Sequence, residues 1–235
     1  MKHQQPRSGR KRTDLPGFLF DLDGTLIDGV YQHVTTWSQA LHSVGIVIPQ
    51  WKIHRRVGMS GKAFLNGLLR EGVPTPKGVD LDELEQKHDT LFSHTIPSLQ
   101  RLPGTNELLQ YLSRNKIRIA IATTGGRKAT SALLKIIKLP AEFPVLTGDD
   151  VKKAKPSPDV FVAAAKKLHV PIEDCIIVGD SVWDLLAAGR KSALNVGLLS
   201  GGFGQAELEG AGAFRVYSDP ADLLMLIEQL GLPGE

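Results

Sequence analysis

The hydrophobic pattern divides the chain into two kinds of segment. Between residues 30 and 98, apolar side chains recur every three or four positions, which predicts a segment made of helices alone. From about residue 100 onward, short apolar runs alternate with amphipathic stretches, which predicts strands joined by helical crossovers. Another apolar run, residues 18–20, precedes the all-helical segment and predicts the first strand.

Strands separated by helices predict a parallel sheet covered on both faces, and therefore an α/β fold class. The expected strands are residues 18–20, 117–122, 143–147, 175–179, 194–199 and 214–217. The expected helices are residues 29–44, a segment starting near residue 51, and residues 64–69, 81–96, 105–114, 127–138, 157–168, 182–191 and 220–230.

This order predicts an open, Rossmann-like parallel sheet core with an inserted all-helical cap domain. The expected parts are a basic disordered tail, a core in two pieces and the cap, at residues 1–16, 17–29 with 100–235, and 30–99. Open α/β sheets bind ligands outside the carboxyl ends of their strands, so an insertion after the first strand would cover the site as a lid. Trp37 and Trp51 are expected in the apolar core of this cap.

The composition is that of an ordinary globular protein, with 42% hydrophobic and 23% charged residues among 235. No apolar run reaches the roughly 18 residues that span a bilayer. The N-terminus also lacks the apolar core of a signal peptide, so a cytoplasmic protein without a membrane partner is expected. The single cysteine, Cys175, lies in an apolar run and is expected to be buried and structural.

The net charge of +3 is a property of the N-terminal tail. Five basic residues lie among the first twelve, and the remaining sequence is close to neutral. No nucleic-acid partner is therefore expected, with an RNA-binding or anchoring tail as the alternative. The chain is expected to be a monomer or a weak homodimer.

Two carboxylates, Asp21 and Asp23, follow the first strand in a loop that also holds Gly24 and Thr25. Side chains at the carboxyl end of a parallel strand are well placed for chemistry. Asp and Gly also favour turns for local reasons, so a simple turn is the alternative.

Two later segments carry groups suited to an anion. Thr123, Thr124 and Gly125 combine hydroxyls with flexible backbone amides where a helix begins. Lys155 precedes two prolines that stiffen the backbone, which would hold its ammonium group in one direction. The alternatives are a capped turn for the threonines and a solvated surface residue for the lysine.

Asp180 directly follows the strand expected at residues 175–179, and Asp184 lies four residues later on the first turn of a helix. This spacing places both carboxylates on one side of the helix start, where they would suit a hard cation such as Mg²⁺. The alternative is a helix cap followed by an acidic residue that interacts with the helix dipole.

In chain order, these motifs make the sequence resemble the haloacid dehalogenase-like superfamily, in its helical-cap branch of phosphoglycolate phosphatases and β-phosphoglucomutases. The resemblance covers residues 17 to about 230. It implies a Mg²⁺-dependent phosphoric monoester hydrolase in which Asp21 forms an aspartyl-phosphate and Asp23 is the general acid and base. It implies that Mg²⁺ is bound by Asp21, the backbone carbonyl of Asp23 and Asp180, with Asp184 either bonding to the metal directly or holding its coordinated waters.

The same resemblance implies that the phosphate is bound by Gly24, Thr123, Thr124, Gly125 and Lys155. Thr123 and Lys155 would also take part in catalysis, since Lys155 would neutralise both Asp21 and the transferring group. The expected substrate is a small phosphorylated metabolite, either a phosphoglycolate-like acid or a sugar phosphate.

Specificity is expected to depend on cap residues, namely His33, Arg56, Gly58 and Lys62. Arg56 and Lys62 would meet an anionic group or sugar hydroxyls, and a solvated surface role is the alternative for each.

Other activities remain open. Asp23 argues against a dehalogenase, which lacks a second aspartate at this position. A sugar phosphomutase is the enzymatic alternative, because His33 lies where some mutases carry a cap-hinge histidine, although the arginine of those mutases is replaced near Gly61. Thr124 stands where many relatives have Asn, which leaves the subfamily open. The non-enzymatic alternative is a small-molecule-binding regulatory module.

Overall fold

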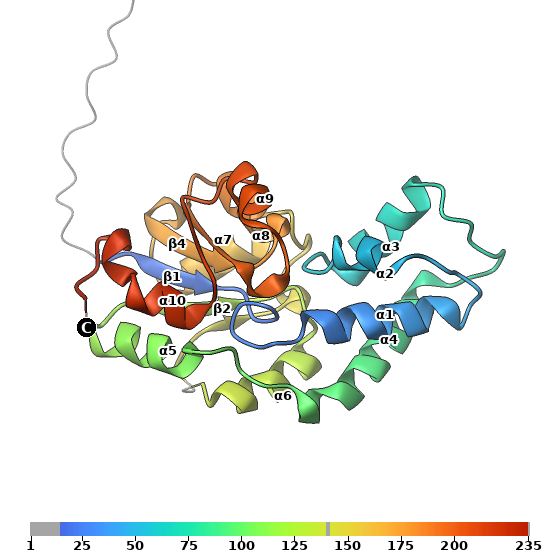
Figure 1. Cartoon of the computed structure of the whole chain (residues 1–235), viewed down its shortest axis with the longest axis horizontal. Coiled ribbons are helices and arrows are strands. Elements are labelled where there is room, and N and C mark those ends of the chain that lie inside the picture. The colour runs from blue at the N-terminus through green and yellow to red at the C-terminus, as the bar shows by residue number, and fades with distance from the viewer. Residues whose placement is uncertain (1–14, 140–141, 235) are drawn as a thin grey trace, which may run out of the picture.

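The computed structural model describes residues 15–139 and 142–234, so the predicted basic tail lies outside the described residues except for Leu15 and Pro16. The described residues form one sheet of six parallel strands in the order β3-β2-β1-β4-β5-β6 (Figure 1). The strands are β1 (Gly17–Phe20), β2 (Ile119–Ala122), β3 (Val145–Leu146), β4 (Cys175–Gly179), β5 (Leu194–Leu198) and β6 (Arg215–Tyr217).

Side chains of β1 alternate between the two faces of the sheet, as the pleat of a strand requires. Phe18 and Phe20 join the apolar cluster that contains α5 (Thr105–Arg114), α6 (Arg127–Ile137) and α10 (Pro220–Met225). Leu19 points to the opposite cluster, which contains residues of α7 (Asp159–Lys167) and α8 (Val182–Gly189). Helices therefore cover both faces, and the predicted α/β fold is confirmed.

A short helix and several 3₁₀ turns complete this part of the chain. The helix α9 (Gln205–Gly210) packs through Leu208 against Leu185 of α8. The turns are η1 (Ile96–Ser98), η2 (Gly148–Asp150), η3 (Ile172–Asp174), η4 (Leu199–Gly201) and η5 (Ile227–Leu230).

The helical lobe, defined as residues 30–98, follows the loop after β1 and lies beyond that end of the sheet (Figure 1). Its helices are α1 (Val30–His42), α2 (Gln50–His54), α3 (Gly61–Arg70) and α4 (Leu81–Thr95). They share their own apolar cluster, in which the rings of Trp37 and Phe64 lie 4.5 Å apart. Ser60 caps α3 and Asp80 caps α4 through side-chain hydrogen bonds.

The structure differs from the sequence predictions at α9, at residues 220–230 and at Trp51. The helix α9 was not predicted, because it is six residues long and buries only Leu208. The segment predicted as a helix over residues 220–230 instead breaks into α10 and η5. The prediction for Trp51 was wrong, since this side chain is 63% exposed on a helix that buries only Ile53.

The prediction for Cys175 is confirmed. The residue is buried, and burial raises the pKa of its thiol to about 12. The thiolate, which is the reactive form, is therefore scarce at neutral pH.

Candidate active site

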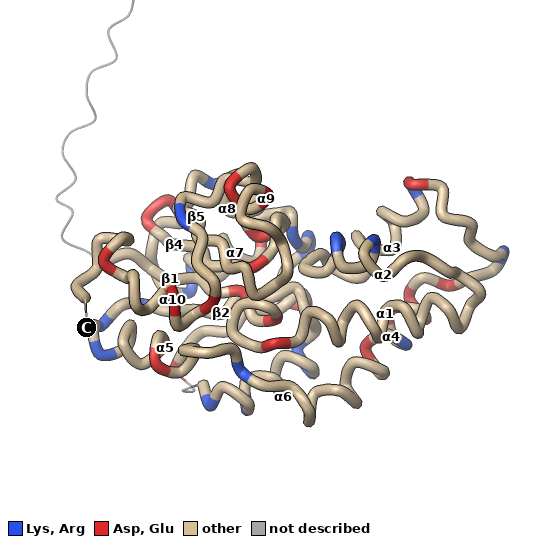
Figure 2. The backbone as a smooth tube through the Cα atoms, in the orientation of Figure 1, with Lys and Arg blue, Asp and Glu red and all other residues tan. Residues whose placement is uncertain are grey.

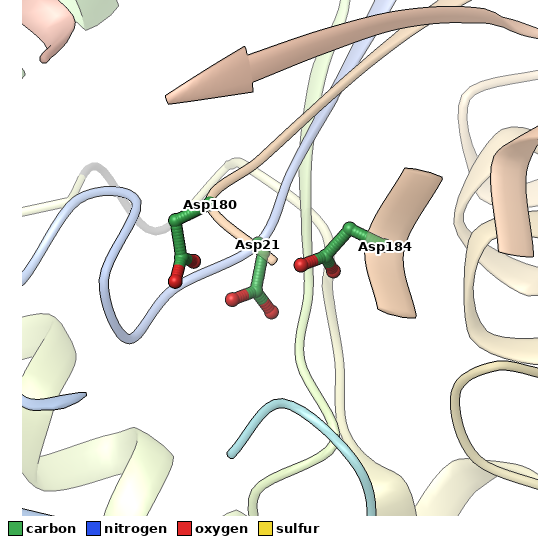
Figure 3. Close-up of side chains that lie close together, drawn as sticks. All are labelled: Asp21, Asp180 and Asp184. Carbon is green, nitrogen blue, oxygen red and sulfur yellow. The ribbon is translucent and has the colours of Figure 1, made fainter. Parts of the chain in front are cut away.

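Three buried carboxylates meet at the carboxyl ends of neighbouring strands. Asp21 follows β1, Asp180 follows β4, and Asp184 lies in the first turn of α8. One oxygen from each of the three lies within 4.8 Å of the others. Figure 3 shows the carboxyl groups converging on one another from these three segments.

The pairing of β1 with β4 explains why these residues meet. Phe20 is in register with Val178, and the backbone N–H of Asp21 donates to the carbonyl of Val178 at 2.9 Å. The two strands consequently end at the same level of the sheet, and the residues that follow them lie side by side. Thr25 then fixes Asp180, since its hydroxyl donates to Asp180 Oδ1 at 2.9 Å.

Asp184 is oriented by a capping box at the start of α8. Its Oδ2 accepts hydrogen bonds from the backbone N–H of Ser181 at 3.2 Å and from the Ser181 hydroxyl at 2.5 Å. The Ser181 hydroxyl also accepts a hydrogen bond from the Asp184 backbone N–H. The helix cap that was the alternative explanation for these residues is therefore present, and it leaves Asp184 in the acidic cluster.

Lys155 is fully buried among these carboxylates. Its ammonium group forms ion pairs with Asp21 and, at 2.7 Å, with Asp184 Oδ1. Burial acts to lower the pKa of Lys155, but the carboxylates of Asp184 and Asp21 together raise it above its ordinary value. Lys155 is therefore a permanent positive charge and not a solvated surface residue.

One ammonium group does not balance the cluster. Burial and the nearby charge of Asp184 together raise the pKa of Asp21 to about 7, although Lys155 beside it acts to lower this pKa. Burial, with the charges of Asp184 and Asp21, also raises the pKa of Asp180 well above its usual range. A bound cation would relieve this repulsion, and carboxylate oxygens are the ligands that hard divalent cations prefer. The chemistry of the donor set thus fits a divalent metal held by Asp21, Asp180 and Asp184.

Asp23 lies beside the cluster and is half-buried. Its Oδ1 is buried without a hydrogen-bond partner among the described residues, and its Oδ2 lies 3.7 Å from His33 Nε2. An unpartnered buried carboxylate oxygen is costly unless a ligand or substrate meets it. Whether the backbone carbonyl of Asp23 ligates a metal stays a prediction.

His33 begins a chain of polar contacts through the helical lobe. Its Nδ1 lies 3.1 Å from His88 Nε2, and His88 Nδ1 lies 3.1 Å from Asp89 Oδ1. His88 and Asp89 were not predicted as site residues. The signal that could have found them is the position of His88, an ionisable residue on the apolar face of a helix.

The loop after β2 supplies hydroxyls and amides. Thr123 is buried, and its Oγ1 accepts a hydrogen bond from the backbone N–H of Gly125 at 3.1 Å. The hydroxyl of Thr124 donates to the carbonyl of Gly58 at 3.3 Å, which links the loop to the helical lobe. Gly24, in the loop after β1, has a φ of 85°, and a Cβ there would overlap the carboxylate of Asp180. Glycine is therefore required at this position.

A cavity of about 690 Å³ lies between the helical lobe and the strand ends. The sheet contributes Asp21, Asp23, Thr123 and Asp180 to its lining, among others. The predicted specificity residues also line it, namely His33, Arg56, Gly58 and Lys62. Lys155 does not line the cavity, but its ammonium group pairs with Asp21, which does.

Both basic specificity residues are already engaged in ion pairs. The guanidinium of Arg56 pairs with Glu71 and donates to the carbonyl of Lys52 at 2.6 Å. The ammonium of Lys62 lies 3.0 Å from Asp82 Oδ1. The structure therefore places both cations at the cavity without leaving either unpaired.

The helical lobe is held against the sheet by polar contacts that sequence analysis missed. Trp183 Nε1 donates to the carbonyl of Arg55 at 3.1 Å, and His54 Nε2 lies 2.8 Å from the carbonyl of Gly201. Arg55 also forms an ion pair with Glu207 of α9. We call these three interactions the lobe contacts.

Two phosphatases and a phosphomutase are similar in sequence to most of this chain. The bifunctional riboflavin kinase/FMN phosphatase of Arabidopsis thaliana is 32% identical over 180 residues, which cover 74% of this chain and 46% of that protein. Hexitol phosphatase A of Escherichia coli (strain K12) is 31% identical over 184 residues, covering 74% and 79%. β-Phosphoglucomutase of Bacillus subtilis (strain 168) is 27% identical over 213 residues, covering 88% and 91%. The chain thus spans about half of the plant protein and most of the bacterial ones.

A solved structure agrees with the architecture. The crystal structure of a hydrolase from Pseudomonas syringae matches with a TM-score of 0.88 at 44% identity, covering 92% of this chain and 99% of that one. The model of the haloacid dehalogenase-like hydrolase family matches residues 15–190.

The parallel sheet, the inserted helical lobe and the carboxylates at adjacent strand ends define an α/β protein with a candidate active site at the carboxyl ends of its strands. The chain belongs to the haloacid dehalogenase-like hydrolase family. It is an enzyme of the phosphatase type, as the family match and the similarity to hexitol phosphatase A show. Among the described residues, no helix has both the length and the apolar character needed to cross a membrane.

Proposed function

We propose that the protein is a Mg²⁺-dependent phosphatase that hydrolyses a small phosphorylated metabolite through an aspartyl-phosphate on Asp21. The observation that carries this proposal is the position of Asp21 at the cavity, paired with Lys155 and grouped with Asp180 and Asp184. A nucleophile that must approach an anionic phosphate needs such compensation by positive charge.

In this proposal each carboxylate at the end of β1 has a separate task. A carboxylate oxygen of Asp21 attacks phosphorus, the bond to the leaving oxygen breaks, and Asp23 donates a proton to that oxygen. Asp23 then takes a proton from water as the water attacks the phosphorus. The bond to Asp21 breaks, and inorganic phosphate is released. The unpartnered Oδ1 of Asp23 supports this role.

The remaining residues bind and orient the phosphoryl group. Lys155 offsets the negative charge of Asp21, and the Thr123 hydroxyl with the amides of the loops at Gly24, Thr124 and Gly125 would donate to phosphoryl oxygens. Mg²⁺, held by Asp21, Asp180 and Asp184, would reduce the repulsion between nucleophile and phosphate. The helical lobe would act as a cap, predicted at residues 30–99, that excludes water during transfer.

Replacement of the nucleophile tests the proposal. Asp21→Asn is expected to lower the Mg²⁺-dependent release of p-nitrophenol from p-nitrophenyl phosphate by about a thousandfold or more. Asp28→Asn is the matched control, because Asp28 is exposed in the same loop and does not line the cavity. Unchanged turnover in Asp21→Asn would refute the assignment of the nucleophile.

A sugar phosphomutase is the second candidate, and the contact between His33 and Asp23 is the observation that favours it. A histidine beside the general acid and base could help retain a phosphorylated intermediate during transfer between two hydroxyls. Product analysis with a hexose 1-phosphate separates the two functions. Free phosphate supports the hydrolase, whereas an isomeric phosphate ester without net phosphate release supports the mutase.

A further inference from the structure

The end of the cavity formed by the helical lobe is acidic. Five charged residues of the lobe line it, two basic and three acidic: Arg56, Lys62, Asp82, Glu85 and Asp89. Figure 2 shows acidic residues along α4 and basic residues beside α2. This region lies opposite the strand ends, where the organic part of a bound phosphate ester would extend.

The two basic residues do not offer a free charge to a ligand. Lys62 is 66% exposed and pairs with Asp82, which is itself part of the lining. Arg56 pairs with Glu71, a further carboxylate of the lobe, and with the carbonyl of Lys52. An anionic group entering here would have to compete with a carboxylate that already pairs with each cation.

The N-terminus of α3 also faces this region and is already satisfied. Ser60 accepts a hydrogen bond from the backbone N–H of Ala63. The backbone N–H of Lys62 lowers the pKa of the nearby Glu85 carboxylate, which lies against Gly61 so closely that a Cβ there would overlap it. The amides and dipole that would otherwise attract an anion are therefore occupied by a carboxylate of the protein.

Glu85 carries negative charge that its neighbours do not fully offset. Burial raises its pKa above the ordinary value, and the nearby charge of Asp89 raises it further, whereas Lys62 lowers it. A second anion beside Glu85 would add to this repulsion. Hydroxyl groups, by contrast, can donate hydrogen bonds to carboxylates and to the side-chain carbonyl of Gln86, which lines the same region.

We propose that this acidic end selects phosphate monoesters whose organic part is an uncharged polyol and excludes those that carry a second anionic group. The inference rests on the proposed phosphatase function and narrows its substrate class. Of the two classes expected from the sequence, it favours sugar or sugar-alcohol phosphates over phosphoglycolate-like acids. Arg56 and Lys62 act in this proposal by holding Glu71 and Asp82, not by binding substrate.

The test compares two substrates that differ at one carbon. D-Glucitol 6-phosphate ends in a hydroxymethyl group, and 6-phospho-D-gluconate carries a carboxylate in its place. The wild type is expected to show a kcat/KM at least about tenfold higher for the glucitol ester, because like charges repel in a partly desolvated site. Glu85→Gln is expected to reduce this ratio at least about threefold.

The ratio is the readout because a general change in activity affects both substrates and cancels. Glu83→Gln is the matched control, since Glu83 is exposed on the same helix and does not line the cavity. Its ratio should equal that of the wild type. Asp82→Asn provides an independent variant, because it frees Lys62 and should reduce the ratio in the same direction.

Two outcomes overturn the inference while leaving the phosphatase function intact. One is a wild type that hydrolyses p-nitrophenyl phosphate and prefers 6-phospho-D-gluconate, or uses both test substrates equally. The other is an unchanged ratio in both Glu85→Gln and Asp82→Asn. Failure of the wild type on all three esters in the presence of Mg²⁺ would instead refute the proposed function itself.

Discussion

Two ionisable residues in this protein, Lys155 and His88, are buried in different charge states. Lys155 is 0% exposed and lies between Asp21 and Asp184, so its charge is compensated by groups of opposite sign. His88 is buried in the helical lobe, where burial lowers its pKa to about 4 even though Asp89 opposes this shift. The first residue is stable as a cation and the second as a neutral ring, because only the first has two buried anionic partners.

Protonation of His88 should destabilise the folded protein. The groups around the ring are His33, Asp89, Asp23, Trp37 and Phe92. The pKa of His88 is about 4 in the folded protein and 6.5 in the unfolded chain, so between these pH values the unfolded chain binds a proton that the folded protein does not. The free energy of unfolding is therefore highest above pH 6.5 and decreases as the pH falls toward 4. The loss should reach about 3 kcal/mol.

Urea denaturation at pH 7.5 and pH 4.5 measures this effect. His88→Phe should show a smaller loss of unfolding free energy between the two pH values than the wild type. His94→Gln serves as the control, because His94 is exposed on the same helix. Equal losses in the wild type and His88→Phe would contradict the prediction.

At the scale of elements, the start of α8 combines a structural and a chemical task. The capping box between Ser181 and Asp184 begins the helix, and the same hydrogen bonds aim Asp184 at Asp21 and Lys155. Sequence analysis treated a cap and a metal ligand as alternatives. In the structure Oδ2 of Asp184 accepts the capping hydrogen bonds and Oδ1 lies in the acidic cluster beside Lys155, so the cap is compatible with the proposed role as a metal ligand.

Ser181→Ala should therefore cost both stability and metal affinity. Loss of the cap is expected to lower the unfolding free energy by about 1 kcal/mol. Loss of the bonds to Asp184 Oδ2 should raise the Mg²⁺ concentration for half-maximal phosphatase activity by about tenfold or more.

A second cap separates these two effects. Asp219 caps α10 through the backbone N–H groups of Ala221 and Asp222, and it does not line the cavity. Asp219→Ala should lose a similar unfolding free energy while the Mg²⁺ dependence stays that of the wild type. The same shift in Mg²⁺ dependence for both variants would attribute it to general destabilisation and refute the positioning role of Ser181.

At the scale of the whole molecule, the sequence predicted what depends on local patterns and missed what depends on packing between distant segments. Apolar runs followed by acidic or hydroxyl residues located the strand ends, because side chains on a parallel sheet meet at its carboxyl edge. The pairing of Arg56 with Glu71 joins residues on different segments of the lobe, and that of His33 with His88 joins α1 to α4. Hydrophobic periodicity carries no information about such pairs. The sequence therefore placed Arg56 and Lys62 at the cavity without predicting the carboxylates that pair with them.

We expect the lobe contacts to couple the position of the helical lobe to substrate binding. Glu207→Gln weakens the ion pair of α9 with Arg55, and Trp183→Phe removes the hydrogen bond to the Arg55 carbonyl. Each change should favour a more open arrangement of the lobe. The expected results are a larger radius of gyration in small-angle X-ray scattering and a KM for p-nitrophenyl phosphate raised about two- to fivefold.

Glu71→Gln supplies the control for this prediction, because it breaks an ion pair of Arg56 that lies entirely within the helical lobe. Its radius of gyration should match the wild type, since no contact between lobe and sheet is lost. If Glu207→Gln and Trp183→Phe also match the wild type in scattering and in KM, the lobe contacts do not control closure. Closure would then depend on contacts nearer the cavity, such as the hydrogen bond from Thr124 to Gly58.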